Sequence, residues 1–320
     1  MLAPMEGVTD FHLRKILTGI GGYDRCVTEF LRVTDHLYPD RVFYKSCPEL
    51  KSGGVTASGT PVYLQLLGSD AHALAQNAVR AVQLGAPGID LNFGCPAKTV
   101  NRHGGGSALL RSPETVANIV QSVRDAVDPE IPVTAKMRLG FYDSSRVVET
   151  AALIEQAGAT ELCVHARTRT DGYRPPAHWE QVRDVSRELS IPIIINGEIW
   201  SVRDAQLARS DSECIDLMLG RGALSVPDLA LHLLAHEPPV SHSQTGGDRV
   251  YQPVSWQGVV ELLQTLLESA AEFPPRYAGN RTKQWLSYLK RGYPEATELF
   301  ERIKRLRSVE EISAELRSAC

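Results

Sequence analysis

The segment DLNFGCPAK, residues 90–98, contains the side chain best suited to proton transfer or covalent chemistry. Glycine and proline flank Cys95, which places its thiol on a loop just after a short apolar run. A thiol on such a loop can reach a substrate and give or take a proton. Cys26, Cys163 and Cys214 lie in apolar runs, and we expect them to be buried and inert. Cys95 is therefore the predicted catalytic residue.

Three consecutive glycines follow this cysteine in the segment HGGGSALL, residues 103–110. Glycines at such a position can bring backbone N–H groups close to a phosphate, or they can let a loop fold tightly. We expect the second role, with the loop folded against the substrate.

Eight short apolar or β-branched runs recur along the chain, about 25 to 45 residues apart, with helical periodicity between many of them. The runs are residues 1–4, 26–28, 62–67, 88–92, 133–137, 161–165, 192–196 and 214–219, and helices are expected at 71–84, 112–127, 146–157 and 201–208. Ser112 before Pro113 indicates a helix start, while Gly85 and Gly158 indicate helix ends. Eight such units predict an α/β fold, a (β/α)8 TIM barrel.

Active sites of this barrel lie at the carboxyl ends of the strands, so the residues that end each run are the candidate site. They are Met5 and Glu6, Thr28 and Glu29, Gln65, Asn92 with Cys95, Lys136 with Arg138, His165 with Arg167, Asn196 with Glu198, and Gly220 with Arg221. Any one of these groups could merely cap a loop. Eight polar strand ends at one rim favour a binding site.

The last two units add glycines and a guanidinium, in Asn-Gly-Glu at 196–198 and Gly-Arg-Gly at 220–222. Gly-Arg-Gly alone is also common in tight turns, but its place after an eighth barrel strand favours a phosphate-bearing cofactor. The nine histidines show no HxH or HxxxH spacing, so no metal site is expected.

The composition is that of an ordinary globular protein, with 320 residues, 43% hydrophobic residues and a net charge of −4. No run approaches the roughly 18 apolar residues of a membrane span, and no signal peptide is evident at the first residues, so we expect a cytosolic protein. The six cysteines form no CxxC pair and are expected to be free thiols. The charge is uneven, because residues 274–307 hold nine Lys and Arg against three Glu, or +6, which leaves −10 on the other 286 residues.

The repeat of strands and helices ends near Leu234, and a segment rich in Pro, Ser, Gly and His follows. We therefore expect a barrel domain over residues 1–236, a linker over 237–253 and a small C-terminal helical bundle over 254–320. Helical periodicity predicts helices at 259–271, 283–290 and 294–306, and the basic segment falls within this bundle. Trp285 and Leu286 are expected in its core.

Taken together, these motifs resemble the flavin-dependent tRNA-dihydrouridine synthases. The resemblance rests on LAPMEGVTD, QLLG, DLNFGCPAKTVNRHGGGSALL, KMRLG, VHARTR, IINGEIW and MLGRGAL, in this order over about 220 residues. The tail, with RTKQWLSYL and EATELFERIKRL, resembles the C branch of bacterial dihydrouridine synthases. Relatives usually begin a few residues earlier than Met1, so we expect the native start to lie upstream.

The resemblance implies that FMN lies across the barrel mouth and that reduced FMN passes a hydride to C6 of a uracil, with Cys95 protonating C5. The implied FMN-binding residues are Pro4, Met5 and Glu6 along the ring system, Gln65 and Lys136 at its polar edge, His165 beside it, and Asn196, Gly197, Glu198, Gly220 and Arg221 at the phosphate. Lys136 could instead be an interior lysine paired with a carboxylate, and His165 could equally hydrogen bond or transfer a proton.

The implied substrate is tRNA, reduced at position 16 of the D-loop, with NADPH as the electron source and no partner subunit required. The implied tRNA-binding residues are Arg32, Asn92, Arg138, Arg281, Lys283, Tyr288 and Lys304. A solvated amphipathic helix is the alternative interpretation of the basic segment.

Two other functions remain open at this stage. A small-molecule FMN oxidoreductase, of the dihydroorotate dehydrogenase or enoate reductase type, would use the same barrel without a basic tail. An RNA-binding barrel without turnover would need no cluster of Cys95, Lys136, His165 and Arg221.

Overall fold

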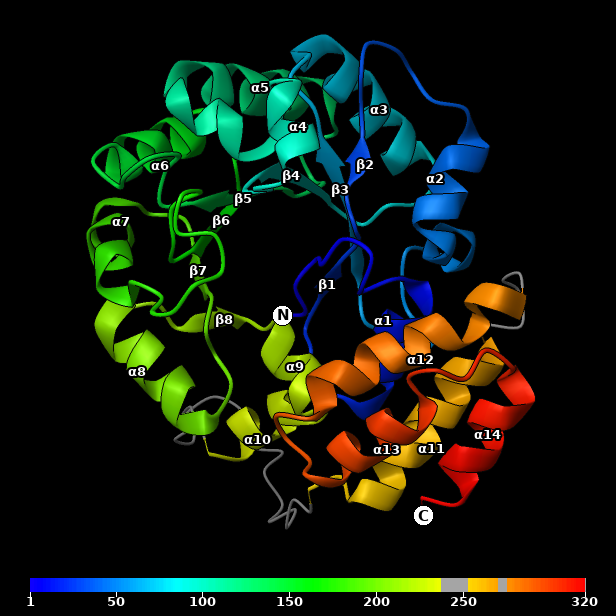
Figure 1. Cartoon of the computed structure of the whole chain (residues 1–320). Helices are drawn as coiled ribbons and strands as arrows, with labels where there is room; N and C mark the ends of the chain where they lie inside the picture. The colour runs from blue at the N-terminus through cyan, green and yellow to red at the C-terminus, as the bar shows by residue number, and fades with distance from the viewer. Residues whose placement is uncertain (237–252, 270–274, 320) are drawn as a thin grey trace, which may run out of the picture.

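A computed structural model of the chain describes residues 1–236, 253–269 and 275–319, so the predicted linker lies outside the described residues except for Pro253. Parallel strands run in chain order around a barrel (Figure 1). They are β1 Cys26–Val27, β2 Leu31–Arg32, β3 Val62–Leu67, β4 Ile89–Phe93, β5 Val133–Arg138, β6 Glu161–His165, β7 Ile193–Asn196 and β8 Asp216–Met218. Leu2 pairs with both Cys26 and Leu219, which closes the barrel between its first and last strands.

Helices follow the strands and form the outer layer of the barrel (Figure 1). They are α1 Phe11–Ile20, α2 Asp40–Ser46, α3 Ala71–Gln83, α4 Lys98–Arg102, α5 Pro113–Ala126, α6 Val147–Gln156, α7 Arg183–Glu188, α8 Val202–Ser212, α9 Arg221–Ser225 and α10 Leu229–Ala235, with 3-10 turns η1 Pro48–Ser52, η2 Gly106–Arg111 and η3 Trp179–Val182. The four helices predicted in this part of the chain are confirmed within a few residues.

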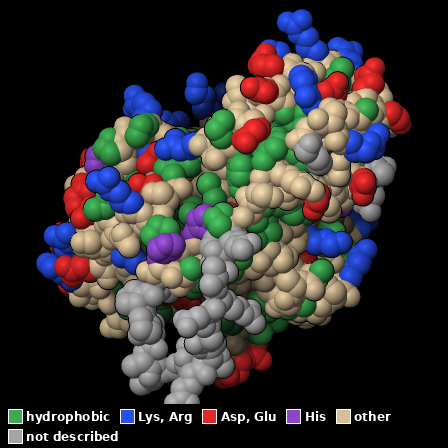
Figure 2. Space-filling view, turned by 90° about the horizontal axis from the view of Figure 1, so that it is seen from below, with side chains coloured by type: hydrophobic (Ala, Val, Ile, Leu, Met, Phe, Trp, Pro, Cys, Tyr) green, Lys and Arg blue, Asp and Glu red, His purple; other side chains and the backbone are tan. Residues whose placement is uncertain are grey.

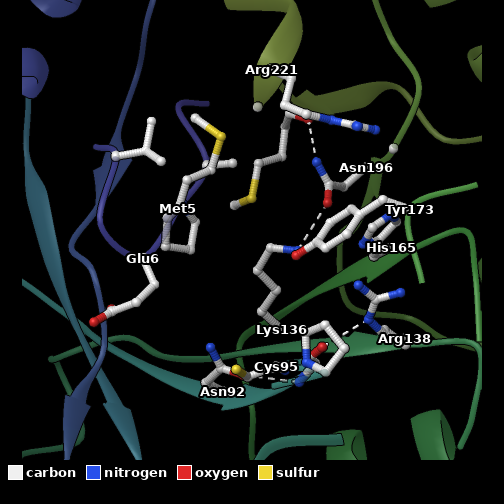
Figure 3. Close-up of a pocket in the computed structure, with 18 of the residues that line it drawn as sticks. Met5, Glu6, Asn92, Cys95, Lys136, Arg138, His165, Tyr173, Asn196 and Arg221 are labelled. Carbon is white, nitrogen blue, oxygen red and sulfur yellow. Dashed lines mark hydrogen bonds between the residues drawn. The ribbon is translucent and has the colours of Figure 1, made fainter. Parts of the chain in front are cut away.

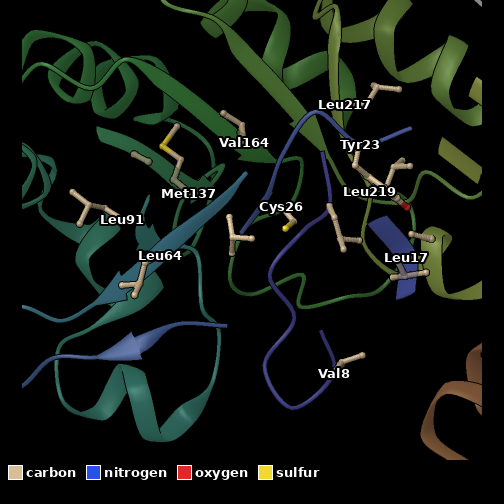
Figure 4. Packing of buried hydrophobic residues seen from close by; sticks show 14 of the residues in the cluster. Val8, Leu17, Tyr23, Cys26, Leu64, Leu91, Met137, Val164, Leu217 and Leu219 are labelled. Carbon is tan, nitrogen blue, oxygen red and sulfur yellow. The ribbon is translucent and has the colours of Figure 1, made fainter. Parts of the chain in front are cut away.

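Alternating residues of each strand face the barrel interior and the helices. The interior is filled by one small cluster: Ala3, Val27, Tyr63, Cys163, Ile194 and Met218. The larger cluster lies between strands and helices and includes Leu64, Leu91, Met137 and Val164 (Figure 4). The interior positions two residues farther along the strands therefore open at the barrel mouth, and this alternation places Gln65, Asn92, Lys136, His165 and Asn196 there.

The first two strands differ from the expectation of continuous runs. Only Leu2 of residues 1–4 is paired as a strand residue, with backbone hydrogen bonds to Arg25 and Val27, and its neighbours Met1 and Ala3 form backbone hydrogen bonds with Leu219. Pairing with β3 also continues beyond the second predicted run, residues 26–28, because Cys26 pairs with Val62 and Leu31 pairs with Leu66. The chain advances five residues from Cys26 to Leu31 while β3 advances four from Val62 to Leu66. The one extra residue forms a bulge beside the barrel mouth. Arg32 thus lies within a strand rather than after one.

The C-terminal helices α11 Trp256–Ser269, α12 Pro275–Leu289, α13 Glu295–Ile303 and α14 Val309–Arg317 pack on one another and against the barrel side formed by α1 and α9 (Figure 1). Trp285 and Leu286 are buried, as expected, and Trp285 donates its indole N–H to the carbonyl of Leu224 on α9 at 3.0 Å. The helical bundle is confirmed. The bounds of the two domains remain a prediction.

Helix α12 begins eight residues before the predicted start at Lys283. Its first half lacks a clear apolar period and contains Gly279, where a Cβ would come 2.3 Å from Cδ1 of Ile312 on α14. The close approach of two helices, which sequence periodicity does not reveal, explains both the glycine and the missed half. On the underside of the molecule, acidic and basic side chains are interspersed (Figure 2). Two such pairs on the bundle are Arg302 with Glu315 and Lys304 with Glu301.

Candidate functional site

A pocket of about 630 Å³ opens at the carboxyl ends of the strands (Figure 3). Its volume is typical of sites for small molecules and cofactors. Its lining includes every residue expected to hold the cofactor: Pro4, Met5, Glu6, Gln65, Lys136, His165, Asn196, Gly197, Glu198, Gly220 and Arg221. Cys95, Asn92, Arg138 and Tyr288 line it as well, whereas Arg32, Arg281, Lys283 and Lys304 do not.

A chain of buried hydrogen bonds crosses the pocket floor from β5 to β3 and β4. Asp90 accepts from the hydroxyl of Thr134 at 2.6 Å and from Nε2 of Gln65 at 2.7 Å. Oε1 of Gln65 in turn accepts from Nδ2 of Asn92 at 2.7 Å. Because Asp90 accepts from Nε2 of Gln65, the amide of Gln65 has one orientation, with Oε1 toward Asn92. This orientation in turn requires Nδ2 of Asn92 to face Gln65. Burial raises the pKa of Asp90, although its hydrogen bonds with Thr134 and Gln65 oppose that rise.

The backbone before Cys95 is held by the last amide of this chain. Oδ1 of Asn92 accepts from the backbone N–H groups of Gly94 and Cys95, each at 2.9 Å. Burial raises the pKa of the Cys95 thiol and the negative charge of Glu6 adds to the rise, while Arg138 opposes it. The thiol therefore keeps its proton at neutral pH, as a general acid must. The described cysteines other than Cys95 are buried.

Lys136 lies in the middle of the pocket, between Cys95 at one end and Arg221 at the other in the view of Figure 3. Its ammonium donates to Oδ1 of Asn196 at 2.9 Å, and Nδ2 of Asn196 donates to the carbonyl of Met218 at 2.7 Å. The hydrogen-bond partner of Lys136 is thus an amide, and not a carboxylate as in the alternative interpretation of an interior ion pair. A cation remains available to a ligand.

His165 is buried beside this lysine and is surrounded by cationic side chains. Burial and the charges of Arg138, Lys136, Arg167 and Arg221 hold its pKa well below the usual range, so its imidazole is neutral. Arg167 lies 3.3 Å from Nε2 of His165 and can only donate, which makes Nε2 the acceptor and places the proton on Nδ1. The neutral imidazole of His165, with its hydrogen on Nδ1, is suited to donate a hydrogen bond to a ligand rather than to transfer a proton.

The carboxylate of Glu198 lies among donors at the Arg221 end of the pocket. It accepts from Arg167, from the indole N–H of Trp200 at 2.8 Å and from Arg221 at 3.4 Å. Burial opposes the charged form of Glu198, but the hydrogen bonds from Arg167 and Trp200 outweigh it and lower its pKa. An ionised carboxylate repels phosphate, so Glu198 can serve an anion only by orienting arginines or through its backbone. Arg221 also lies over the rings of Tyr173 and Trp200.

Arg138 is buried, and most of its donors are used within the protein. Its Nε donates to the carbonyl of Gly94 at 2.8 Å, and Nη1 donates to the carbonyls of Thr168 and Gly172 at 3.0 and 2.8 Å. It thus joins the loop before Cys95 to the loop after β6. Its guanidinium lies over the ring of Tyr173, with Cζ at 5.1 Å from the ring centroid, and both residues line the pocket.

The loop that carries Met5 and Glu6 is held by helix α12. Arg281 donates to the carbonyls of Gly7 and Val8 and forms an ion pair with Asp10 at 2.8 Å. Burial and the neighbouring charge of Glu29 raise the pKa of Glu6. Helix α12 of the bundle therefore supports the loop that carries Met5 and Glu6, a role that sequence reasoning did not assign to Arg281.

Three other residues that are expected to contact RNA, Arg32, Lys283 and Lys304, lie outside the pocket. Lys283 donates to the carbonyl of Leu306, and Lys304 pairs with Glu301. Arg32 is half-buried in β2, where its carbonyl accepts from Tyr38 at 2.9 Å. Tyr288 is the member of this set on α12 that reaches the pocket.

Several pocket or supporting residues were missed by sequence reasoning. Asp90 and Thr134 could have been found from strand alternation, because each lies two residues before a predicted site residue. Tyr173 and Trp200 lie in loops with no periodicity, and nothing in the sequence indicated that they would flank Arg221.

No helix in the described part of the chain is long and apolar enough to cross a membrane. Among the described residues, no group of three or more His, Cys, Asp or Glu could hold a metal ion.

Comparison with known proteins gives one family and one fold. The family model described as dihydrouridine synthase matches residues 1–315. A protein of Shewanella oneidensis named tRNA-dihydrouridine(16) synthase is 48% identical over 100% of this chain and 97% of its own length. A protein of Pseudomonas putida with the same name is 50% identical over 95% of this chain and 92% of its own length.

Solved structures show the same barrel in more distant proteins. The old yellow enzyme homologue of Zymomonas mobilis has a TM-score of 0.51 at 11% identity, covering 75% of this chain and 89% of that chain. A variant of it has a TM-score of 0.52 at 14% identity, covering 75% of this chain and 87% of that chain. At such identity the likeness shows the fold alone.

Proposed function

This chain belongs to the dihydrouridine synthase family, and from that premise we propose that it reduces uridine 16 in the D-loop of tRNA to 5,6-dihydrouridine. It is a flavin-dependent tRNA-dihydrouridine synthase. The position is supported by the relatives that carry the name tRNA-dihydrouridine(16) synthase at 45 to 50% identity. The observation that carries the chemistry is the thiol of Cys95 in the same pocket as Lys136 and His165. Burial raises the pKa of this thiol, which suits a proton donor.

The pocket fits FMN in the chemistry of its walls. One wall is apolar and contains Ala3, Pro4, Met5 and Met218, which suits a flat ring system. Next to this wall, the pocket offers the guanidinium of Arg221 and the close backbone of residues 196–198 and 220–222, which suits a phosphate. A glycine is required at 197, because a Cβ there would come 2.7 Å from Cδ2 of His165.

We assign the FMN contacts to the residues that the family resemblance implied. Lys136, oriented by Asn196, offers a cation to the electron-rich edge of a reduced ring, and Gln65 offers the amide hydrogen that Asp90 does not use. His165 offers its Nδ1–H. Glu198 acts through Arg167 and Arg221 rather than by touching the phosphate with its side chain.

Reduced FMN, when bound, supplies the hydride that C6 of the uracil receives, and NADPH is the proposed source of its electrons. Cys95 gives the proton of Sγ to C5 of the uracil. Its raised pKa keeps that proton in place until the substrate arrives. Asn92 and Arg138 hold the loop of Cys95 from two sides, and we propose that their remaining donors meet the base or a neighbouring phosphate.

A uridine in folded tRNA must leave its stack to reach this pocket, and the rest of the RNA needs a surface to bind. We propose that this surface comprises Arg32, Arg281, Lys283, Tyr288 and Lys304. Tyr288 borders the pocket and is suited to contact nucleotides beside the target. The protein would act as a monomer in the cytoplasm, where its substrate is found.

Purified protein incubated with FMN, NADPH and an unmodified tRNA transcript tests this function. We expect dihydrouridine at position 16, and its loss when Cys95 is replaced by Ala. Reduction of an enoate or oxidation of dihydroorotate without activity on tRNA would favour the small-molecule alternative. Protein that binds tRNA but takes up no FMN would contradict the flavin chemistry.

A further inference from the structure

The carbonyl oxygen of Cys95 accepts an unusual number of hydrogen bonds. Nδ2 of Asn101, on α4, donates to it at 2.8 Å. The backbone N–H and the hydroxyl of Ser107, on η2, lie 3.1 and 2.9 Å from it. Two elements that follow the cysteine in sequence therefore converge on its own peptide group.

These donors and the amide oxygen of Asn101 form one connected set of hydrogen bonds. A carbonyl oxygen has two lone pairs, and Asn101 and the N–H of Ser107 fill them. The hydroxyl of Ser107 also lies 3.0 Å from Oδ1 of Asn101, so it can bond to the amide oxygen. That bond fixes the amide with Nδ2 toward Cys95, and Nδ2 also lies 3.3 Å from the carbonyl oxygen of Gly105, to which its second hydrogen can donate.

Glycine at position 106 lets the two elements come this close. Gly106 has φ of +59°, and a Cβ there would lie 2.8 Å from the carbonyl oxygen of Cys95 and 3.0 Å from its Cβ. The glycine run thus folds against the cysteine itself. Neither Asn101 nor Ser107 lines the pocket.

We propose that Asn101 and Ser107 are positioning residues for the Cys95 thiol, an inference that rests on the proposed role of Cys95 as the proton donor. Asn92 holds the N–H of Cys95 from the barrel side, and Asn101 with Ser107 holds its carbonyl from the other. With both peptide groups fixed, rotation about the Cα–Cβ bond is the main freedom left to the thiol. Proton transfer to carbon depends steeply on distance, so this restriction favours the reactive geometry.

Asn101→Ala and Asn101→Asp form the test, with the same two substitutions at the exposed Asn118 of α5 as matched controls. Asn101→Ala removes the donor. Asn101→Asp keeps the shape and the acceptor for Ser107, but it turns a carboxylate oxygen toward the carbonyl of Cys95. Both variants are measured with FMN bound for kcat and for KM with tRNA, and FMN affinity is titrated separately.

We expect kcat to fall between about 10-fold and about 100-fold in both Asn101 variants, since a displacement near 1 Å can cost about 100-fold. FMN affinity and KM for tRNA should stay within about twofold of the unaltered chain, because the side chain touches neither ligand. In Asn101→Asp the added negative charge disfavours the thiolate, so the high-pH limb of the rate profile should move to higher pH. Ser107→Ala provides a second variant, with a smaller fall in kcat.

Full kcat in Asn101→Asp would overturn the proposal, because shape alone would then suffice. A fall in kcat that follows a parallel fall in FMN affinity or thermal stability would also overturn it, since the role would be merely structural. If the unaltered chain forms no dihydrouridine, the proposed function itself fails, and the positioning role fails with it.

Discussion

Replacing Gly197 with Ala tests whether the close packing of this backbone on His165 shapes the flavin pocket. Gly197 has φ of +114°, and a Cβ there would lie 2.7 Å from Cδ2 and 3.1 Å from Nε2 of His165. Gly59 provides a matched control, with φ of +84° and no atom within 4 Å of an added Cβ. The two substitutions share the cost of a positive φ, and only the first has the clash.

The magnitudes follow from these two terms. A side chain at positive φ costs roughly 1–2 kcal/mol. A clash with a buried neighbour adds about 1–3 kcal/mol when the side chain must move. We therefore expect Gly59→Ala to lower the free energy of unfolding by about 1–2 kcal/mol and Gly197→Ala by about 2–5 kcal/mol.

The same displacement should weaken flavin binding. FMN binding would have to return the displaced imidazole of His165 to its place. The clash energy of about 1–3 kcal/mol then corresponds to roughly a 5-fold to 150-fold loss of FMN affinity. Titration of flavin-free protein, followed by quenching of FMN fluorescence, measures this loss. Equal FMN affinities in Gly197→Ala, Gly59→Ala and the unaltered chain would show that the contact between residue 197 and His165 does not shape the flavin pocket.

Three further predictions follow from the site and the bundle. Cys95→Ala should keep FMN bound while single-turnover reduction falls by about 10²- to 10⁴-fold, and full activity would exclude the thiol as the acid. Burial lowers the pKa of His165, so the stability it confers is complete above the unfolded pKa of about 6.5 and is lost as the pH falls toward the folded pKa. His165→Gln should thus lose less thermal stability than the unaltered chain on acidification from about pH 7.5 to about pH 5, and parallel losses would contradict this. Lys283→Ala and Lys304→Ala should each make the fall of log affinity for tRNA with log salt less steep, by about 0.7 to 0.9 in slope, whereas Arg203→Ala on α8 should leave the slope unchanged. Unchanged slopes in the two lysine variants would exclude both lysines from the interface.

Much of the site could be predicted because strands in this fold follow a simple rule. Residues at strand ends alternate between the interior and the helices, so Gln65, Asn92, Lys136, His165 and Asn196 necessarily share one mouth once the strands are located. The same rule, carried two residues back along β4, would have placed Asp90 below them.

What the sequence did not reveal depends on contacts between distant segments. Arg281 was expected on the RNA surface because it belongs to a basic run, and the sequence did not reveal that it also binds the carbonyls of Gly7 and Val8 near the start of the chain. Local charge indicates only that a residue is basic, and a partner more than 270 positions away leaves no local pattern. The glycines after Cys95 were expected against the substrate, whereas Gly106 packs on the cysteine itself.

The central claim is that this pocket reduces one uridine of the D-loop. Position-resolved mapping of dihydrouridine in tRNA from cells with and without this protein tests it most directly. We expect dihydrouridine at position 16 in cells that contain the protein and unmodified uridine there in cells that lack it. The unaltered chain should restore dihydrouridine, and Cys95→Ala should not. Dihydrouridine that persists at position 16 without the protein, or disappears only from other positions, would contradict the account.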